Sequence, residues 1–216
     1  MLDDAFFDRP ATELAPALLG KVLRRWIGGE RVEVAIVEAE AYLRTERASH
    51  SSLGRTPSRE SMWAPPGTLY LYHSQGGPSL NLSSRGDGDA VLIKAAVPVS
   101  NLDLLHRLNP RRSGERRPDH RLCSGQGLLC RALDLSVRAW DGRRFRPGEF
   151  ELVDGPEPKR IAVTPRLGIP AGRDEHLPYR FVHAEHARSA TKNPLTMRRW
   201  TDGEDYEVVS AASLLR

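Results

Sequence analysis

The segment Val34–His50 (VAIVEAEAYLRTERASH) carries the side chains of this chain best suited to acid–base chemistry. It begins as a strand, in which alternate side chains share a face. If the strand is regular, one face is made of Val32, Val34, Ile36, Glu38, Glu40 and Tyr42. Carboxylates on an apolar face are costly unless they reach a cavity, a partner or solvent. The pattern therefore predicts either a general base beside a pocket or a strand that emerges into water.

A lysine in a second apolar strand is the other candidate for chemistry. Lys94 interrupts the run AVLIKAAV, and a buried lysine requires a carboxylate or an opening. Glu40 or Glu38 is its natural partner. Glu38 is interpreted as structural, bonded to the backbone or to an arginine. Taken singly, tyrosines on strands and a histidine in a serine-rich loop are more typical of packing and of solvent exposure than of a site.

The elements that position these residues form an α+β pattern. Helices and strands are mixed without a regular alternation of strand and helix, which favours a single mixed domain over residues 1–216 rather than a doubly wound fold. The segment 44–67 is long, polar and irregular, which is typical of a functional loop. We expect helices over 13–19 (capped by Thr12), 100–108 (capped by Ser100) and 124–133, and strands over 21–27, 31–42, 68–72, 79–83, 90–97 (ended by Pro98), 150–153, 161–164 and 179–182.

The charge of the chain is unevenly distributed. Its formal net charge is +4, and the stretch 107–121 alone holds six arginines against one Glu and one Asp. Arginine suits phosphate oxygens, so this stretch predicts either contact with a polyanion or a solvated loop. Two cysteines make neither a zinc site nor a disulfide framework, which fits a reducing, cytoplasmic setting. There is no apolar run of about 18 residues and no secretory signal, so no membrane partner is expected.

Five blocks in order and spacing identify a family. They are VEAEAYL, RASHSS-GRTPSR, M-x-x-PPGTLYLY, LNLSSRGDGDAVLIKA and SGQGLLCRAL. Together they resemble the alkyladenine (3-methyladenine) DNA glycosylases, in a bacterial form, over about residues 11–183. The resemblance implies a curved, mainly antiparallel sheet with flanking helices. It also implies a monofunctional, monomeric enzyme of the bacterial nucleoid that hydrolyses the N-glycosidic bond of damaged purines in double-stranded DNA, using water and no metal or other cofactor.

The resemblance gives each candidate residue a role. Glu40 matches the general base that deprotonates the water attacking C1′ of the sugar. Lys94 matches a basic side chain that orients this water together with a backbone carbonyl near Leu167. The rings of Tyr42, His50 and Tyr72 would stack on the flipped base. The Asn81 amide would exclude the exocyclic amine of guanine, and Met62 would close one side of the pocket.

Two departures from the family's pattern bear on substrate choice. The family usually has Arg at the position of Lys94, and the two side chains are not equivalent in a bidentate role. Gln75 stands where the family inserts a bulky wedge into the DNA. We therefore expect 3-methyladenine and 7-methylguanine to be preferred, with hypoxanthine a weaker substrate. The expected DNA contacts are Gln75, Arg59, Arg111, Arg112, Gly125 and Gly127.

Two other functions remain open from the sequence. One is a non-catalytic nucleic-acid-binding module whose pocket senses flipped bases. The other is a metal-dependent hydrolase that uses Glu38, Glu40 and His50, which is disfavoured because both acids lie on one strand without a second histidine nearby.

Overall fold

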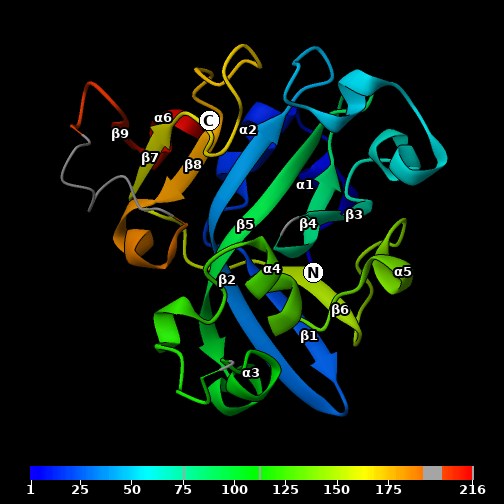
Figure 1. Cartoon of the computed structure of the whole chain (residues 1–216), viewed down its shortest axis with the longest axis vertical. Helices are drawn as coiled ribbons and strands as arrows, with labels where there is room; N and C mark the ends of the chain where they lie inside the picture. The colour runs from blue at the N-terminus through cyan, green and yellow to red at the C-terminus, as the bar shows by residue number, and fades with distance from the viewer. Residues whose placement is uncertain (75, 112, 192–200, 216) are drawn as a thin grey trace.

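One long strand organises the molecule. The structure is a computed structural model that describes residues 1–74, 76–111, 113–191 and 201–215. Strand β2 (Glu30–Tyr42) pairs with β5 (Ala90–Ser100) along one edge. On its other edge it pairs first with β1 (Val22–Ile27) and then with β8 (Arg180–His183). In Figure 1, β2 and β5 run side by side through the middle of the molecule.

The remaining strands extend this centre on both sides. The sheet order is β3-β4-β5-β2-β8-β7-β9, with β1 between β2 and β6. Every pair of these strands is antiparallel, so the predicted α+β fold with a mainly antiparallel sheet is confirmed. The outer strands are β3 (Leu69–Ser74), β4 (Gly77–Ser83), β6 (Phe150–Val153), β7 (Arg160–Thr164) and β9 (Glu207–Ser210).

Short helices surround the sheet. They are α1 (Asp4–Phe7), α2 (Ala11–Ala17), α3 (Leu102–Leu108), α4 (Gln126–Ala132), α5 (Val137–Trp140) and α6 (Ala211–Leu214), with 3-10 turns η1 (His50–Leu53), η2 (Pro57–Trp63), η3 (Asp119–Arg121) and η4 (Ala184–Ser189). Both predicted caps are wrong. Pro10 precedes α2, which places Thr12 inside its first turn. Asn101 caps α3, because its side chain accepts the N–H of Leu104 at 3.2 Å. None of the described helices has the length and apolar character needed to cross a bilayer.

One face of the sheet is the core. Side chains from α2 and α4, such as Leu14 and Leu129, join it there, and Phe7 docks against Phe145 with ring centroids 5.9 Å apart. On β3 and β4 the core residues alternate with Tyr70 and other residues that face the opposite side. The polar candidates therefore lie on the face that the main core does not use.

Two bulges direct the polar residues to that face. The register of β2 against β5 skips Val37 on one strand and Lys94 on the other. A bulge re-aims the side chains that follow it. The prediction that Glu38 and Glu40 share the face of the preceding apolar residues is therefore wrong, because the first bulge moves both to the other face. The core-facing residues of β2 are Val32, Val34, Ile36, Ala39 and Ala41.

Strand β5 also continues past its predicted end. Pro98 lies opposite Val34, next to a further shift in register, and β5 runs on to Ser100. A proline has no N–H for the ladder, and it is accommodated at such irregular positions. The loop 44–67 is irregular as predicted, apart from η1 and η2.

Candidate active site

A buried acid–base pair lies on the non-core face. The Glu40 carboxylate is fully buried, and its Oε1 accepts a hydrogen bond from Lys94 Nζ at 2.7 Å. Its Oε2 accepts the Tyr42 hydroxyl at 2.8 Å. The Lys94 side chain is 12% exposed, so this pair reaches solvent only on the lysine side. The predicted pairing of Lys94 with one of the two acids is confirmed, and the partner is Glu40.

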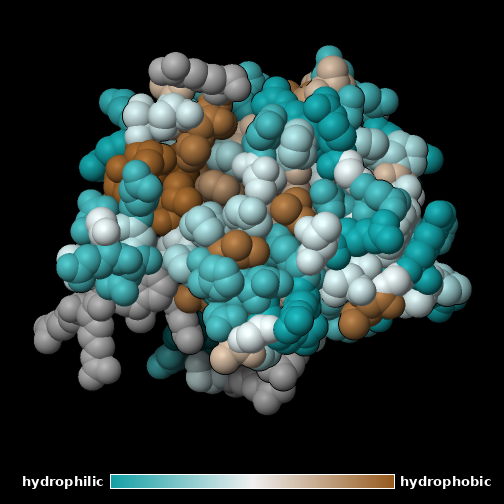
Figure 2. Space-filling view, turned by 90° about the horizontal axis from the view of Figure 1, so that it is seen from above, coloured by the Kyte–Doolittle hydropathy of each residue, from teal (hydrophilic) through white to brown (hydrophobic). Residues whose placement is uncertain are grey.

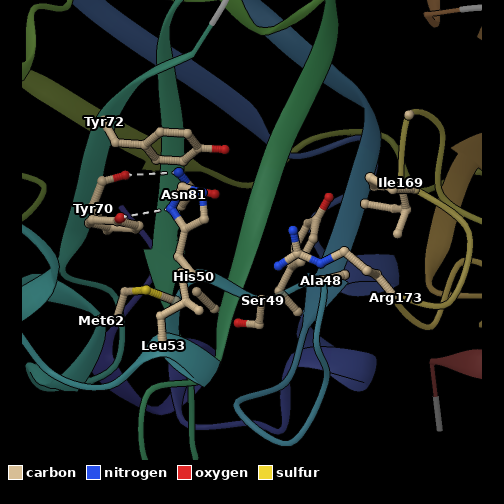
Figure 3. Close-up of a pocket in the computed structure, with 14 residues that line it drawn as sticks. Ala48, Ser49, His50, Leu53, Met62, Tyr70, Tyr72, Asn81, Ile169 and Arg173 are labelled. Carbon is tan, nitrogen blue, oxygen red and sulfur yellow. Dashed lines mark hydrogen bonds between the residues drawn. The ribbon is translucent and has the colours of Figure 1, made fainter.

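An aromatic pocket adjoins this pair. It is a cavity of about 330 Å³, a size typical of small-ligand sites, and Tyr42 is one of its walls. The Tyr70 and Tyr72 rings lie 5.5 Å apart at an interplanar angle of 29°, and the His50 ring lies 4.2 Å from that of Tyr72. His50 Nδ1 is 3.1 Å from the Tyr70 hydroxyl, and this contact is drawn as a dashed line in Figure 3. The pocket is thus lined with stacked and tilted rings that suit a flat guest.

The sheet register explains how distant residues meet here. Tyr70, Asn81, Leu92, Glu40 and Arg180 lie directly opposite one another on five neighbouring strands. Cross-strand neighbours of this kind are close enough to interact. One row across the sheet therefore joins the aromatic wall to the buried acid.

Two further predicted residues complete the walls. Asn81 donates to the carbonyl of Tyr70 at 3.1 Å, which fixes the orientation of its amide. Met62, on η2, is buried and lines the pocket. Leu167 does not line the pocket, whereas the three residues that follow it, Gly168–Pro170, do.

The wall formed by residues 168–173 was missed by sequence reasoning. Arg173 lines the pocket from the side facing Tyr72, next to Ile169 (Figure 3). Ala48, Ser49, Leu53 and Tyr70 are further lining residues that were not predicted as pocket residues. The only available signal was the short glycine- and proline-containing run after β7, which is typical of any loop. For Tyr70, the signal was its alternation with Tyr72.

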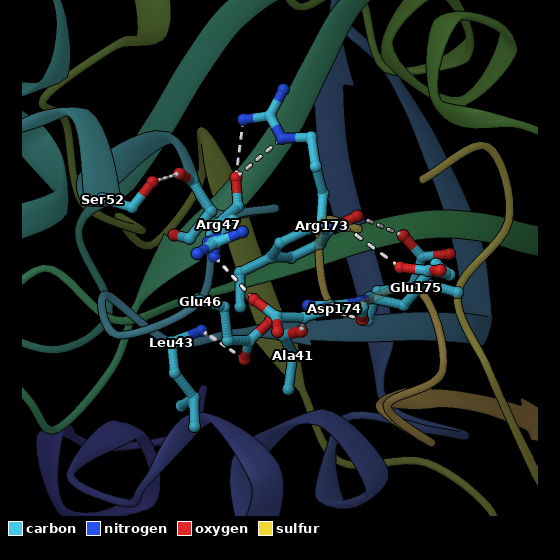
Figure 4. A network of polar contacts seen from close by, with 12 residues as sticks. Ala41, Leu43, Glu46, Arg47, Ser52, Arg173, Asp174 and Glu175 are labelled. Atoms are coloured by element: carbon cyan, nitrogen blue, oxygen red, sulfur yellow. Dashed lines mark hydrogen bonds and ion pairs between the residues drawn. The ribbon is translucent and has the colours of Figure 1, made fainter. Parts of the chain in front are cut away.

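A network of polar contacts holds this wall against the loop after β2 (Figure 4). Arg173 donates through Nε and Nη2 to the carbonyl of Arg47, at 3.1 and 2.6 Å. The Arg47 N–H in turn donates to Asp174 at 2.8 Å. Beneath them, the buried Arg166 donates to the Ala41 carbonyl at 2.7 Å and forms an ion pair with Glu46.

The same arginine supports a pocket ring. The Arg166 guanidinium lies 4.5 Å from the centroid of the Tyr42 ring, a cation–π geometry. Burial, followed by the nearby Glu40 carboxylate, raises the pKa of Tyr42 well above its ordinary value. Tyr42 therefore remains a neutral hydrogen-bond donor to Glu40.

The histidine in the pocket is held neutral. Burial, followed by the positive charges of Arg59 and Arg173, lowers the pKa of His50 from its ordinary value of 6.5. At neutral pH the imidazole thus carries no charge. A neutral ring offers one donor and one acceptor, and it does not repel a cationic guest.

Glu38 belongs to the frame of the site. Its carboxylate accepts from Arg180 Nε at 2.7 Å and from the Thr191 N–H at 2.6 Å, and all of its side chain is buried. The prediction of a structural acid bonded to the backbone or to an arginine is confirmed, and Glu38 is bonded to both. Among the residues that the structure describes, no three His, Cys, Asp or Glu side chains gather where they could hold a metal ion.

Two of the predicted DNA contacts, Gly125 and Gly127, line a second cavity. This cavity of about 350 Å³ is lined by Lys94, Gly125 and Gly127 among others. Gly127 has a packing reason to be glycine, because a Cβ there would lie 2.0 Å from the Gly76 carbonyl oxygen.

The arginines expected to contact DNA make different contacts within the protein. Arg59, on η2, is half-buried and donates to the Gly54 carbonyl at 3.2 Å. Arg111 pairs with Glu115 at 3.1 Å. Gln75 and Arg112 lie outside the described residues. Seen from above, the surface is mostly hydrophilic with separate apolar patches (Figure 2).

Fold and site together define a class of protein: a single α+β enzyme with an aromatic slot for one flat ring next to a buried carboxylate and a lysine. Comparison with known proteins identifies the family. The family model for methylpurine-DNA glycosylase (MPG) matches residues 5–187. The chain belongs to this family. It is therefore a DNA repair glycosylase that hydrolyses N-glycosidic bonds in DNA.

Relatives agree over most of the chain. A protein of Pseudomonas syringae pv. tomato is 49% identical over 213 residues, which cover 95% of each chain. One of Pseudomonas aeruginosa UCBPP-PA14 is 45% identical over 216 residues, covering 96% of this chain and 90% of the relative. An archaeal relative from Methanocella arvoryzae is 39% identical over 182 residues, with coverage of 82% and 88%. Each carries the name "Putative 3-methyladenine DNA glycosylase".

Proposed function

We propose that this protein flips an alkylated purine out of duplex DNA into the pocket walled by Tyr42, His50 and Tyr72, and that Glu40 drives hydrolysis of its glycosidic bond. The supporting observation is the hydrogen bond between the Glu40 carboxylate and the Tyr42 hydroxyl. Tyr42 also lines the pocket, so a base stacked there brings its sugar towards Glu40 and Lys94. Extrusion is least costly for a damaged or mispaired base.

Recognition rests on the rings and on the neutral histidine. Stacking on aromatic side chains contributes about 1–3 kcal/mol per base. A cationic 3-methyladenine or 7-methylguanine gains additional attraction from the faces of the tyrosine rings. Because His50 is uncharged, it does not oppose this gain. Hypoxanthine is neutral and lacks that contribution, so it is the weaker substrate. Asn81 excludes the exocyclic amine of guanine, and Met62 closes one side.

Glu40 acts as the general base. It removes a proton from the water that attacks C1′, while the departing purine keeps the electrons of the broken bond and leaves uncharged if it was a cation. The carboxylate also stabilises the positive charge that develops on the sugar. Lys94 has two ammonium protons beyond the one donated to Glu40, and with the Leu167 carbonyl it orients the water.

The remaining contacts hold the DNA. Arg59, Arg111 and Arg112 supply charge to phosphates, Gly125 and Gly127 let the backbone approach closely, and Gln75 fills the gap left by the flipped nucleotide. The enzyme acts as a monomer at the bacterial nucleoid, and it requires no metal. Excision that is insensitive to a chelator is the expected result, and loss of excision restored by a divalent cation contradicts the water-only mechanism.

The direct test is Glu40→Gln. The amide still accepts from Lys94 but cannot take a proton, so single-turnover excision of 7-methylguanine should fall by about 10²–10⁴-fold. Binding of the same duplex should stay within a few-fold of wild type. Glu60→Gln, which removes an exposed carboxylate paired with Arg55, is the matched control and should excise normally. A Glu40→Gln enzyme that folds and cleaves at the wild-type rate refutes the assignment.

A further inference from the structure

The described arginines of the stretch 107–121 fall into two groups. Arg107 is paired with Glu30, and Arg116 with Asp103 at 3.6 Å. These two cations bind the stretch to the body of the protein. Three other described arginines of the stretch, Arg111, Arg117 and Arg121, line a third cavity of about 400 Å³ between this stretch and α4. Its remaining lining residues are Pro118, His120, Ser124 and Leu128.

Most of the arginines around this cavity have no carboxylate partner among the described residues. Among the described residues, no ion pair joins Arg117, Arg121 or Arg131 to a carboxylate, and only Arg111 is neutralised, by Glu115. Arg117 Nε is buried without a hydrogen-bond partner. Burial and the positive charges of Arg111 and Arg131 lower the pKa of Arg117. Cations gathered in this way are unfavourable unless an anion joins them.

This cavity shares a lining residue with the cavity beside Lys94. Leu128 lines both cavities, and Arg131 lines the second one together with Lys94. Lys94 in turn bonds to Glu40. The cationic side chains therefore form a track that leads from the buried acid, across α4, to the stretch 107–121.

We propose that this track binds the phosphodiester backbone on one side of the flipped nucleotide, with Arg117, Arg121 and Arg131 as the phosphate donors. Arginine matches phosphate oxygens with two parallel N–H donors, and neutralising phosphates is the main source of affinity for DNA. The track rests on the proposed function, since it presupposes a flipped nucleotide in the aromatic pocket. It positions the duplex and takes no part in the chemistry.

The test is Arg117→Gln/Arg131→Gln, because neither guanidinium is committed to an ion pair in the described residues. Binding of a duplex with a central 7-methylguanine is measured against KCl concentration. Each phosphate contact contributes about 0.9 to the slope of log affinity against log salt, so the double variant should lower the slope by about 1.8. Arg138→Gln, an exposed arginine on α5 at the other side of the molecule, should leave the slope unchanged (Figure 1).

A second arm places the track on one flank. Duplexes are shortened on either the 5′ or the 3′ side of the lesion. Shortening the duplex on one flank should abolish the difference in salt slope between the double variant and wild type. Shortening it on the other flank should leave that difference unchanged. A wild-type slope in the double variant overturns the proposal, and so does an equal loss from both flanks. Binding of inorganic phosphate at Arg117, combined with a wild-type salt slope in the double variant, indicates a site for free anions and also overturns the proposal.

Failure of this proposal is distinguishable from failure of the proposed function. A wild-type salt slope in the Arg117→Gln/Arg131→Gln variant, together with lost excision in Glu40→Gln, overturns the track and leaves the proposed function standing. Loss of excision in Glu40→Gln tests the chemistry independently of the salt slope.

Discussion

At the scale of the residue, the site depends on keeping one ring neutral. His50 lies against Tyr72 and within hydrogen-bonding distance of Tyr70. Under the proposed function, a protonated imidazole would repel a cationic purine, whereas a neutral ring would allow it to stack. Burial and two nearby guanidiniums act in the same direction, so the neutral state does not depend on one contact.

Removing either guanidinium should raise the pKa of His50. Arg173→Gln and Arg59→Gln each delete one positive charge, but burial, the largest cause of the shift, remains. The pKa of His50 should therefore rise in each variant and stay below 6.5. NMR titration of the His50 ring signals, assigned by their absence in His50→Gln, measures it. Arg138→Gln serves as the control, and an unchanged pKa in both variants contradicts the electrostatic account.

The residue scale also shows what the sequence could predict. A lysine within AVLIKAAV requires a partner, and that requirement alone predicted its pairing with an acid on the neighbouring strand. Glu38 was interpreted as structural on similar grounds and is bonded to Arg180. Arg173 offered no such signal, because it lies in a loop and bonds to the Arg47 carbonyl, more than a hundred residues earlier in the chain.

At the scale of the element, the bulges decide which side chains reach the pocket. Periodicity predicted β2 and its partners but placed the acids on the wrong face. A bulge changes the phase of alternation by one residue, and nothing in a period-two pattern marks where the extra residue falls. The extra residues are Val37 and Lys94, which have opposite characters, so residue type does not reveal the bulges either. The two helix caps were mispredicted for different reasons. Pro10 precedes α2 and makes no side-chain cap hydrogen bond, whereas at α3 the polar cap is Asn101, one residue after the predicted Ser100.

The turn between β3 and β4 depends on a close approach to α4. Gly127→Ala would place a Cβ 2.0 Å from the Gly76 carbonyl oxygen, so the turn must move away. We expect a destabilisation of about 1–3 kcal/mol from this overpacking and slower excision, because this turn carries Gln75. Gly76→Ala is a matched control, since a Cβ there meets nothing within 4 Å. Thermal melts and single-turnover excision compare the two. Equal behaviour of the variants would show that the contact is not needed.

At the scale of the whole molecule, the site and the far edge of the sheet are separate. The pocket and the acid lie on β2, β3, β4 and β5 and on the loops beside them. The opposite edge is completed by β9, which pairs with β7, and α6 follows it. Both lie beyond the part of the chain that the family model matches. Edge strands expose unpaired backbone groups, so β9 protects β7 from association with other chains.

Ending the chain before Thr201 tests this separation. The truncation removes β9 and α6, and with them the packing of Val208, Val209 and Ala211 against the two nearby apolar clusters. Burial of a few such side chains contributes roughly 3 kcal/mol or more, so the melting temperature should fall by about 5–15 °C and the tendency to aggregate should rise. Excision at 25 °C should remain within about two-fold of wild type, because every pocket residue is retained. Glu207→Gln, an exposed change on β9, is the control for the melt. If the truncated protein melts as wild type does but no longer releases the damaged base, this edge of the sheet belongs to the active site, and the division between the site and the supporting edge is wrong.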